Sequence, residues 1–354
     1  MKASSSPMRS FGSDNHSGVH PKILEALVAI NQGHAHSYGE DPLSHQLEKE
    51  IQRLMPLAHK TFLVFNGTAA NVLALKVALK SHQACLCSEV SHLNLDECAA
   101  PERVAGRKLI PRPSHDGKLR PEDLEESIIR RGDQHFAQVR MLSITQPTEL
   151  GTAYSLEELK DLREFCSRHK LMLHIDGARW ANAACFLGVS WEQMLQAADP
   201  DLLSLGGTKN GLMGAEALIV FERARELAED LRYQRKQLLQ LPSKTRFLAA
   251  QMLAYLRDDL YLEIAHWSLD RAQELEQAIS GIEGLHLQYP VQSNALFVQF
   301  PKTWTKALRQ KYFFYIWDEQ QWVARWMTSF DTTSEDIHNF AQELRQQSQK
   351  ERSL

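Results

Sequence analysis

The sequence predicts an α/β protein with a mostly parallel sheet covered by helices on both faces, followed by a smaller α+β domain. Two observations predict this class. Between residues 62 and 221, short apolar runs alternate with amphipathic stretches of helical period, which is typical of a buried parallel sheet. Near Glu222 the pattern changes to successive helices and then to short strands. We therefore expect an N-terminal arm over residues 1–20, a large domain over 21–245 and a small domain over 246–354.

The composition is that of an ordinary globular protein and argues against several functional classes. Its 354 residues suggest two or three domains at roughly 150 residues each. With 43% hydrophobic and 24% charged residues, the chain resembles neither a disordered protein nor a coiled coil. The 40 basic and 44 acidic side chains give a net charge of −4, which argues against a nucleic-acid partner bound through a basic face. Because the five cysteines are few and odd in number, and no signal peptide or membrane-spanning run is visible, we expect a reduced, cytoplasmic protein.

The large domain is expected to begin with two helices and then a strand that leads into a third helix. Pro21 begins the first helical pattern, which ends near Gly33, and the second pattern begins at about Leu43. An apolar run over residues 62–65 precedes the next helix, which is expected over 69–80. Further strands are expected at residues 84–87, 108–111, 139–145, 171–176, 202–205 and 217–221, with helices at 121–131, 155–169 and 179–187.

The small domain is expected to combine helices with a short-stranded sheet. Helical patterns follow one another from residue 222 to about 281, and a last helix begins after Thr333. Between them, strands are expected at residues 285–289, 295–300, 313–317 and 322–327. Four tryptophans are expected to fill the core of this domain, namely Trp304, Trp317, Trp322 and Trp326.

Two polar side chains follow neighbouring strands at the edge where ligands bind in parallel sheets. Asp176 ends an apolar strand and is followed by Gly177 and a helix. Lys209 follows the next strand and is bracketed by glycines, which let backbone approach a ligand closely. The two residues are 33 positions apart, a separation that fits one strand–helix–strand crossover. We therefore expect Asp176 and Lys209 to face the same crevice.

A lysine and a carboxylate in one crevice suit a cofactor that is a pyridine aldehyde. The lysine forms an imine with the aldehyde, and the carboxylate keeps the ring nitrogen protonated so that the ring accepts electrons. Gly67-Thr68 lies between a strand and a helix start, where free N–H groups and the helix dipole favour a phosphate. Together the three signals predict a pyridoxal 5′-phosphate site.

Simpler interpretations exist for each of these residues taken alone. Lys209 is compatible with an ordinary solvated lysine, Asp176 with a helix N-cap, and Arg179 with pairing to a surface acid. A zinc site was also considered for four neighbouring side chains, namely His82, Cys85, Cys87 and His92. Their spacing differs from that of common zinc sites, so no metal site is expected.

Six motifs resemble the low-specificity L-threonine aldolases, which are β-eliminating lyases with the aspartate-aminotransferase-like fold of type I pyridoxal-phosphate enzymes. The motifs are Ser13-Asp14-Asn15, Tyr38-Gly39-Glu40-Asp41-Pro42, Asn66-Gly67-Thr68-Ala69-Ala70-Asn71, Ser91-His92, His174-Ile175-Asp176-Gly177-Ala178-Arg179 and Gly206-Gly207-Thr208-Lys209-Asn210-Gly211. The resemblance runs from about Phe11 to Leu344. The last two motifs in this order are its specific part.

This resemblance implies a role for each matching residue. Lys209 forms the imine with the cofactor, Asp176 bonds the pyridine nitrogen, and His92 stacks on the ring and is a candidate to take the proton of the substrate hydroxyl. The other residues implied to bind the cofactor are Gly67, Thr68, Arg179, Thr208 and, from a neighbouring subunit, Arg246. The residues implied to bind the substrate are Ser13, Arg179 and Arg325, which clamp its carboxylate, and Tyr38, which acts across a subunit interface.

The resemblance also implies an activity and an assembly. The activity is the cleavage of L-threonine or L-allo-threonine to glycine and an aldehyde, by a homotetramer or dimer with active sites at subunit interfaces. Other reactions of the same cofactor (β-elimination, transamination, racemisation) and an inactive binding protein of the same fold remain alternatives. Some relatives have Asn-Thr-His in the segment that ends here in Gln146–Glu149, which contains no histidine. The absence of this histidine places the base role on His92 or on a water.

Overall fold

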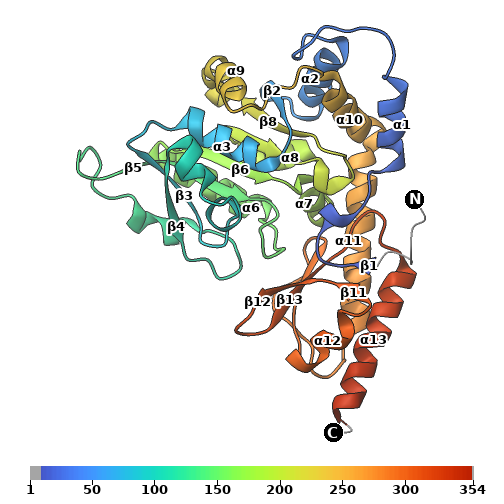
Figure 1. Ribbon diagram of the computed structural model, residues 1–354. Coiled ribbons are helices and arrows are strands. Elements are labelled where there is room, and N and C mark those ends of the chain that lie inside the picture. Colours follow the sequence, from blue (N-terminus) through green and yellow to red (C-terminus); the bar gives the residue numbers. More distant parts are fainter. Residues whose placement is uncertain (1–8, 353–354) are drawn as a thin grey trace.

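The computed structural model describes residues 9–352, and its central element is a seven-stranded sheet in the order β2-β8-β7-β6-β5-β3-β4 (Figure 1). β8 runs antiparallel to both of its neighbours, and the other pairs are parallel. The mostly parallel sheet predicted from the sequence is therefore confirmed. In sheet order, the strands are β2 (Ala58–Val64), β8 (Glu216–Phe221), β7 (Leu202–Leu205), β6 (Met172–Gly177), β5 (Gln138–Thr145), β3 (Gln83–Ser88) and β4 (Lys108–Arg112).

Helices cover both faces of this sheet, so its central strands are apolar on both sides. All residues of β7 and β8 are buried. On one face, side chains of the sheet pack with α3 (Gly67–Ala78) and α9 (Leu227–Gln237). The helices that pack on the other face are α2 (Pro42–Leu54), α6 (Leu156–His169), α7 (Trp180–Leu187), α8 (Trp191–Ala198) and α10 (Arg246–Leu256). Burial on both faces explains why the strands read as continuous apolar runs rather than as alternating ones.

The register of the parallel strands brings their carboxyl ends to one edge. Thr145 at the end of β5 pairs with Asp176 near the end of β6, and Asp176 pairs with Ser204 of β7. The segments that follow these three strands therefore begin side by side, which places the predicted site at this edge.

A second sheet lies beside the part of the molecule that is built on the seven-stranded sheet (Figure 1). It is antiparallel and has four strands in the order β12-β13-β10-β9. Its strands are β9 (His286–Leu287), β10 (Ala295–Gln299), β12 (Tyr315–Asp318) and β13 (Val323–Met327). The helices around it are α11 (Leu260–Ile279), α12 (Thr305–Leu308) and α13 (Ser334–Arg352). In Figure 1, the long helix α11 runs from the large sheet down to this small sheet, beside α13.

The division into arm, large domain and small domain stays a prediction, and residues 1–8 of the arm lie outside the described residues. The packing favours a boundary later than residue 245. Leu248 of α10 and Ile264 of α11 belong to the core of the large sheet, whereas Leu275 of α11 belongs to the core of the small one. Phe11, in the predicted arm, is also buried in the core of the small sheet.

The arm is tied to the small sheet by a short strand pair. β1 (Arg9–Ser10) pairs in parallel with β11 (Tyr312–Phe313). The backbone carbonyl of Phe11 accepts a hydrogen bond of 2.7 Å from the N–H of Met327 in β13. The chain then crosses toward the large sheet and continues into α1 (Pro21–Ala29). The arm therefore connects the small sheet with the edge of the large one.

Several elements differ from the sequence prediction. The helix expected over residues 121–131 is a short α5 (Pro121–Leu124) followed by a single turn, because Arg130 adopts a left-handed conformation before Gly132. The strand expected over residues 313–317 is divided at Phe314 into β11 and β12. Three helices were missed, namely α4 (His92–Leu95), α8 and α12. α8 begins with a capping box of Ser190 and Gln193, a sequence signal for a helix start.

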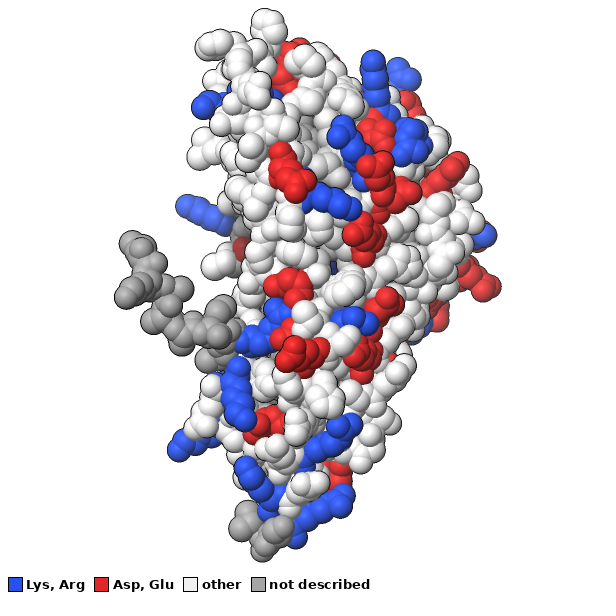
Figure 2. Space-filling model, turned by 90° about the vertical axis from the view of Figure 1, so that its right-hand side faces the viewer, with Lys and Arg blue, Asp and Glu red and all other residues white. Residues whose placement is uncertain are grey.

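The outer surface bears both signs of charge. On the face that carries α1, α10 and α13, acidic and basic side chains lie interspersed (Figure 2). None of the helices between Arg9 and Arg352 has the length and apolar character needed to cross a membrane.

Candidate active site

A cavity of about 610 Å³ lies where the carboxyl ends of β5 and β6 meet the turn after β7 and the small sheet. Six of the residues singled out in the sequence line it together. They are Ser13, His92, Asp176, Arg179, Lys209 and Arg325. The expectation that Asp176 and Lys209 face one crevice is met by this geometry.

Close packing holds the turn that carries Lys209 in place. A Cβ on Gly206 would lie within 2.6 Å of the Cα of Ala178, and one on Gly207 would lie 2.7 Å from a backbone oxygen. The carboxylate of Glu216 accepts hydrogen bonds from the N–H groups of Gly207 (3.1 Å) and Thr208 (3.2 Å). Burial raises the pKa of Glu216 to about 7. The glycines and Glu216 together fix the backbone from which Lys209 projects.

Lys209 is a partly buried lysine whose amine has no partner in the described chain. Within the described part of the chain, its ε-amino group makes no hydrogen bond or ion pair. Burial and the charge of Arg179 lower the pKa of Lys209, although Asp14, Asp176 and Glu216 act in the opposite direction. A lower pKa increases the fraction of neutral amine, which is the form that adds to a carbonyl group. The ordinary solvated lysine considered from the sequence therefore does not describe this residue.

The carboxylate of Asp176 is held at the end of β6 by two donors. Its Oδ2 accepts a hydrogen bond of 2.7 Å from Asn71 Nδ2, and its Oδ1 accepts one of 3.0 Å from the N–H of Ala178. The residue is only 6% exposed. The N-cap of α7 is Arg179 and not Asp176, so the capping alternative does not account for this side chain. The carboxylate is fixed at the edge where a cationic ring nitrogen would need it.

His92 is oriented by a buried carboxylate that the sequence reasoning missed. Its Nδ1 lies 3.0 Å from Oε1 of Glu97, and the same oxygen accepts a hydrogen bond of 2.8 Å from Asn71 Nδ2. A chain of hydrogen bonds therefore joins His92, Glu97, Asn71 and Asp176. The hydrogen bond to Glu97 raises the pKa of His92. Asn71 was within a quoted motif, and Glu97 follows His92 by five residues, but neither position alone indicates this contact.

Arg179 is held by Asp14, another residue whose role the sequence reasoning missed. Its Nε and Nη2 donate to the two carboxylate oxygens at 2.6 and 2.9 Å. Asn294 Nδ2 donates to the same carboxylate at 3.2 Å. Burial raises the pKa of Asp14, but the charge and hydrogen bonds of Arg179 outweigh it, so the pKa is lowered overall. The acid that pairs with Arg179 is thus buried in the site and not at the surface, and Nη1 is the guanidinium nitrogen left for another anion.

Arg325 and Ser13 complete the wall of the cavity on the side of the small sheet. Arg325 Nη2 donates to the carbonyl of Gly12 at 3.1 Å, and its guanidinium lies 4.9 Å from the ring centroid of Trp317. Burial lowers the pKa of Arg325 to about 10. Trp304 and Trp326 are buried in the core of the small sheet and Trp322 packs against it, as expected. Trp317 packs against residues of β10 and β13 on the other side of that sheet, but it is only partly buried and also lines the cavity.

Gly67 and Thr68 form the start of α3, one helical turn before Asn71. Asn66 caps the helix by accepting a hydrogen bond of 2.9 Å from the N–H of Ala69. The N–H groups of Gly67 and Thr68 have no hydrogen-bond partner among residues 9–352. A Cβ on Gly67 would meet nothing within 4 Å, so the space in front of this helix end is open. The arrangement suits an anion, as expected from the sequence.

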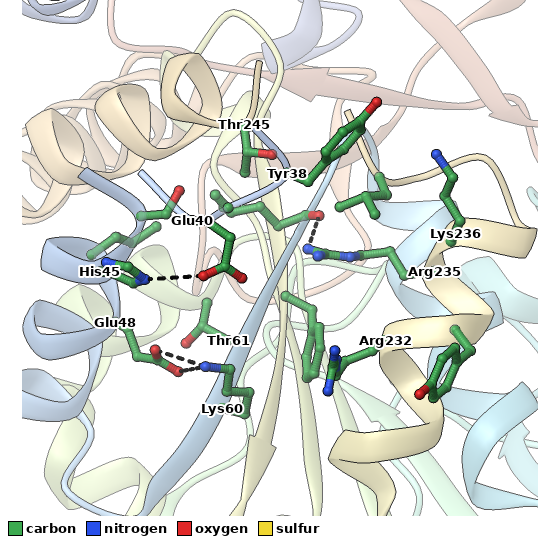
Figure 3. A pocket seen from close by; sticks show the side chains of 17 residues that line it. Tyr38, Glu40, His45, Glu48, Lys60, Thr61, Arg232, Arg235, Lys236 and Thr245 are labelled. Atoms are coloured by element: carbon green, nitrogen blue, oxygen red, sulfur yellow. Dashed lines mark hydrogen bonds and ion pairs between the residues drawn. The ribbon is translucent and has the colours of Figure 1, made fainter. Parts of the chain in front are cut away.

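Tyr38 and Arg246 do not line this cavity. Tyr38 is 49% exposed and lies in a second cavity, of about 820 Å³, bordered by α2, β2 and α9 (Figure 3). There Lys236 lies 5.1 Å from the ring centroid of Tyr38. Arg246 begins α10, and its Nη1 donates to the carbonyl of Gln32 at 3.4 Å. Within one chain, these two residues are separate from the group around Lys209.

Comparison with known proteins agrees with this geometry. The family model described as beta-eliminating lyase matches residues 10–302. A low specificity L-threonine aldolase of Pseudomonas aeruginosa is 38% identical over 336 residues, which cover 95% of this chain and 96% of the relative. A relative of the same name from Saccharomyces cerevisiae is 28% identical over 280 residues, which cover 78% and 70% of the two chains.

Solved structures agree with the fold. The structure of a threonine aldolase of Leishmania major is similar with a TM-score of 0.90 and 29% identity, and the match covers 96% of this chain and 99% of that one. An aspartate aminotransferase of Thermus thermophilus is similar with a TM-score of 0.70 and 15% identity, over 95% and 90% of the chains. At that identity the second similarity concerns the fold alone. It agrees with the aspartate-aminotransferase-like architecture expected from the sequence.

Proposed function

The chain belongs to the β-eliminating lyase family, and from this premise we propose that it uses pyridoxal 5′-phosphate to cleave L-threonine and L-allo-threonine to glycine and an aldehyde. The observation that carries the proposal is the unpartnered amine of Lys209 in one cavity with the fixed carboxylate of Asp176. The identity of 38% over 95% of the chain to a threonine aldolase supports the choice of substrate.

The residues present fit this cofactor. Lys209 offers an amine of lowered pKa for covalent attachment, and Asp176 would hold the proton on the pyridine nitrogen. The free N–H groups of Gly67 and Thr68 would bind the phosphate. Thr208, which directly precedes Lys209, would be a further residue that binds the cofactor. When bound, the cofactor supplies an aldehyde that takes up the substrate amine and a ring that accepts the electron pair released at Cα.

The arginines of the cavity would orient the substrate. Nη1 of Arg179, the guanidinium of Arg325 and the hydroxyl of Ser13 are available to bind the substrate carboxylate. Holding the carboxylate at two points fixes rotation about the bond to Cα, and this decides which bond of Cα breaks. Asp14 contributes by keeping Arg179 in place. His92, whose ring orientation Glu97 fixes, would stack on the cofactor ring. A base on this side of the cavity then removes the proton of the β-hydroxyl group.

The finer statements on assembly and location are part of the same proposal. We propose a homo-oligomer, a dimer or tetramer, in which Tyr38 and Arg246 act on the site of a neighbouring subunit. Both residues lie outside the Lys209 cavity of their own chain, which supports this assignment. Mixing inactive Lys209→Ala and Arg246→Ala chains tests it, because a shared site would regain part of the activity in the hybrid. The cytoplasmic location stays a prediction.

The direct test measures the products formed from L-threonine and L-allo-threonine by purified protein supplied with the cofactor. We expect an aldehyde and an equal amount of glycine, and the ratio between the two substrates would report how loosely the hydroxyl configuration is read. Ammonia with a keto acid would indicate β-elimination instead. A folded protein that takes up no cofactor would contradict the proposal and favour a binding role on the same fold.

A further inference from the structure

We propose that Glu149 is a further catalytic residue, the base that takes the proton from the β-hydroxyl group of the substrate. The inference rests on the proposed function. It assigns the base, which is the one catalytic group that the proposed function leaves unassigned. Glu149 follows β5 in the segment that contains no histidine. Its carboxyl group lines the same cavity as Lys209, Asp176 and Arg179.

One oxygen of this carboxyl group is anchored and the other is not. Oε1 accepts a hydrogen bond of 2.7 Å from the backbone N–H of His92 and another of 2.7 Å from Oγ1 of Thr145. Oε2 has no hydrogen-bond partner in the described chain, residues 9–352. A purely structural role, in which Glu149 anchors the first turn of α4, would explain the hydrogen bonds of Oε1 but not the position of Oε2. The second oxygen is left for a group that enters the cavity.

The surroundings of Glu149 favour a stronger base than a solvated carboxylate. Burial raises its pKa, and the neighbouring charge of Asp176 adds to this, while the hydrogen bonds from His92 and Thr145 lower it. A catalytic carboxyl group is most effective when its pKa lies nearer the working pH. The charged or titratable groups that line the cavity with it are His16, His92, Asp96, Asp176, Arg179, Lys209, Tyr315 and Arg325. Behind it, toward the protein interior, lie Cys87 and Tyr154.

His92 is the less suitable acceptor in this geometry. Its Nδ1 is occupied by Glu97, so only Nε2 is left as an acceptor, and the raised pKa reduces the share of neutral imidazole in which Nε2 has a lone pair. A charged imidazole has no lone pair that accepts a proton. A ring that stacks flat on the cofactor also points its nitrogens along the ring plane. Glu149 lines the cavity with an oxygen that has no hydrogen-bond partner in the described chain, and this oxygen accepts a proton whenever the carboxyl group is ionised.

The proton transfer balances without any further reactant. The hydroxyl proton passes to Oε2 of Glu149, and the electron pair of the O–H bond forms the carbonyl bond of the departing aldehyde. The Cα–Cβ bond breaks, and its pair stays with Cα, which takes a proton from solvent to give glycine. Glu149 returns its proton to water once the aldehyde has left. Glu149 thus ends the cycle in the ionised form in which it began.

The variant Glu149→Gln distinguishes a catalytic base from a residue that only anchors the first turn of α4. Its amide oxygen still accepts the hydrogen bonds from His92 and Thr145, but the side chain no longer ionises. We expect kcat for L-threonine to fall by about a hundred- to ten-thousand-fold. KM, the affinity for the cofactor and the absorbance spectrum of the bound cofactor should stay near those of the wild type. The acidic limb of the profile of kcat against pH should disappear.

The matched control is Glu343→Gln, which removes a buried carboxylate of the small sheet region far from the cavity and should retain the activity. A second variant, Glu149→Ala, covers the case in which the glutamine variant does not fold. Formate should restore its activity in proportion to concentration, because a small carboxylate replaces the missing base.

Two results would overturn the assignment. One is a Glu149→Gln protein with kcat within about threefold of the wild type and an unchanged pH profile, a difference too small for a lost base. The other is a folded Glu149→Ala protein that formate does not rescue. Failure of the proposed function is distinguishable from both, since the wild-type protein itself would then release no aldehyde.

Discussion

At the scale of single residues, the site combines one largely buried ion pair with one partly buried amine that has no partner. Asp14 and Arg179 satisfy each other through two hydrogen bonds, whereas Lys209 makes none among residues 9–352. Breaking a buried pair by removing one charge is costly, because the other charge stays buried. A desolvated amine without a partner also opposes folding, and titratable groups of this kind cluster at functional sites. This contrast supports the proposal that Asp14 positions Arg179 and that Lys209 is the reactive group.

The substitution Asp14→Asn tests the role of this pair. We expect the free energy of unfolding to fall by about 3–5 kcal/mol, as for other broken buried pairs. KM for threonine should rise more than kcat falls, because Arg179 loses its orientation and not its charge. Chemical unfolding and steady-state kinetics measure the two effects. The control Asp331→Asn removes a partly exposed partner of Arg9 and should change stability by about 1 kcal/mol or less.

The same pair predicts a dependence of stability on pH. The pKa of Asp14 in the folded protein lies below its ordinary value of 3.8. The ionised carboxylate therefore stabilises the folded protein fully at pH values above 3.8, and this stabilisation is lost as the pH falls through the pKa that Asp14 has in the folded protein. The melting temperature of the wild type should therefore fall more between pH 5 and pH 3 than that of Asp14→Asn. Equal losses in the two proteins would contradict this account.

The sequence alone was sufficient to predict the site residues that carry a strong local signal. It was not sufficient to predict the residues that hold them in place. Asp176 and Lys209 each follow a strand end, and this position could be inferred from apolar runs and glycines. Asp14 acts on Arg179, which is distant in the sequence, whereas Glu97 and Glu216 also act on residues five to nine positions away. In neither case does a local pattern mark the carboxylate as buried. Supporting residues of this kind become visible only when the register of the strands is known.

At the scale of elements, the turn after β7 shows how closely packed backbone positions a reactive side chain. Gly206 lies against Ala178 in the turn after β6, so the turn that carries Lys209 touches the turn that follows Asp176. The sequence predicted the strands of the large sheet well, because burial on both faces leaves long apolar runs. It overestimated the helix at residues 121–131 and missed α8, since helix ends depend on capping and on single left-handed residues more than on periodicity.

The substitution Gly206→Ala tests this contact between turns. The added Cβ would overlap the backbone of Ala178, which cannot move as a side chain can. We expect a loss of about 3 kcal/mol or more in the free energy of unfolding, together with loss of cofactor binding. Thermal unfolding and cofactor titration measure both. Gly18→Ala is the matched control, because nothing lies within 4 Å of its added Cβ, and it should behave like the wild type.

At the scale of the whole molecule, the arm couples the small sheet to the site. Phe11 is fully buried and stacks on Phe340 of α13, with ring centroids 4.6 Å apart. Ser13 and Asp14 follow directly and reach the Lys209 cavity. The site is therefore assembled from both sheets and from the crossing chain. The sequence indicated two domains, but hydrophobic patterns do not show that an arm joins them at the site.

The substitution Phe11→Ala tests this coupling. Removing a fully buried phenylalanine should lower the free energy of unfolding by about 3–5 kcal/mol. Because the arm would lose its anchor, KM for threonine should also rise. Val28→Ala, at a position 74% exposed on α1, serves as the control and should leave both quantities unchanged. A Phe11→Ala protein with reduced stability and an unchanged KM would show that the arm does not position Asp14.

The most direct test of the account is to locate the covalent attachment of the cofactor. Purified protein saturated with pyridoxal 5′-phosphate is reduced with borohydride, digested and analysed by mass spectrometry. The account predicts a stable pyridoxyl group on the peptide that contains Lys209, and none on that peptide in Lys209→Ala, which should also lose threonine cleavage. A pyridoxyl group on a different lysine, or none in a folded protein that has bound the cofactor, would contradict it.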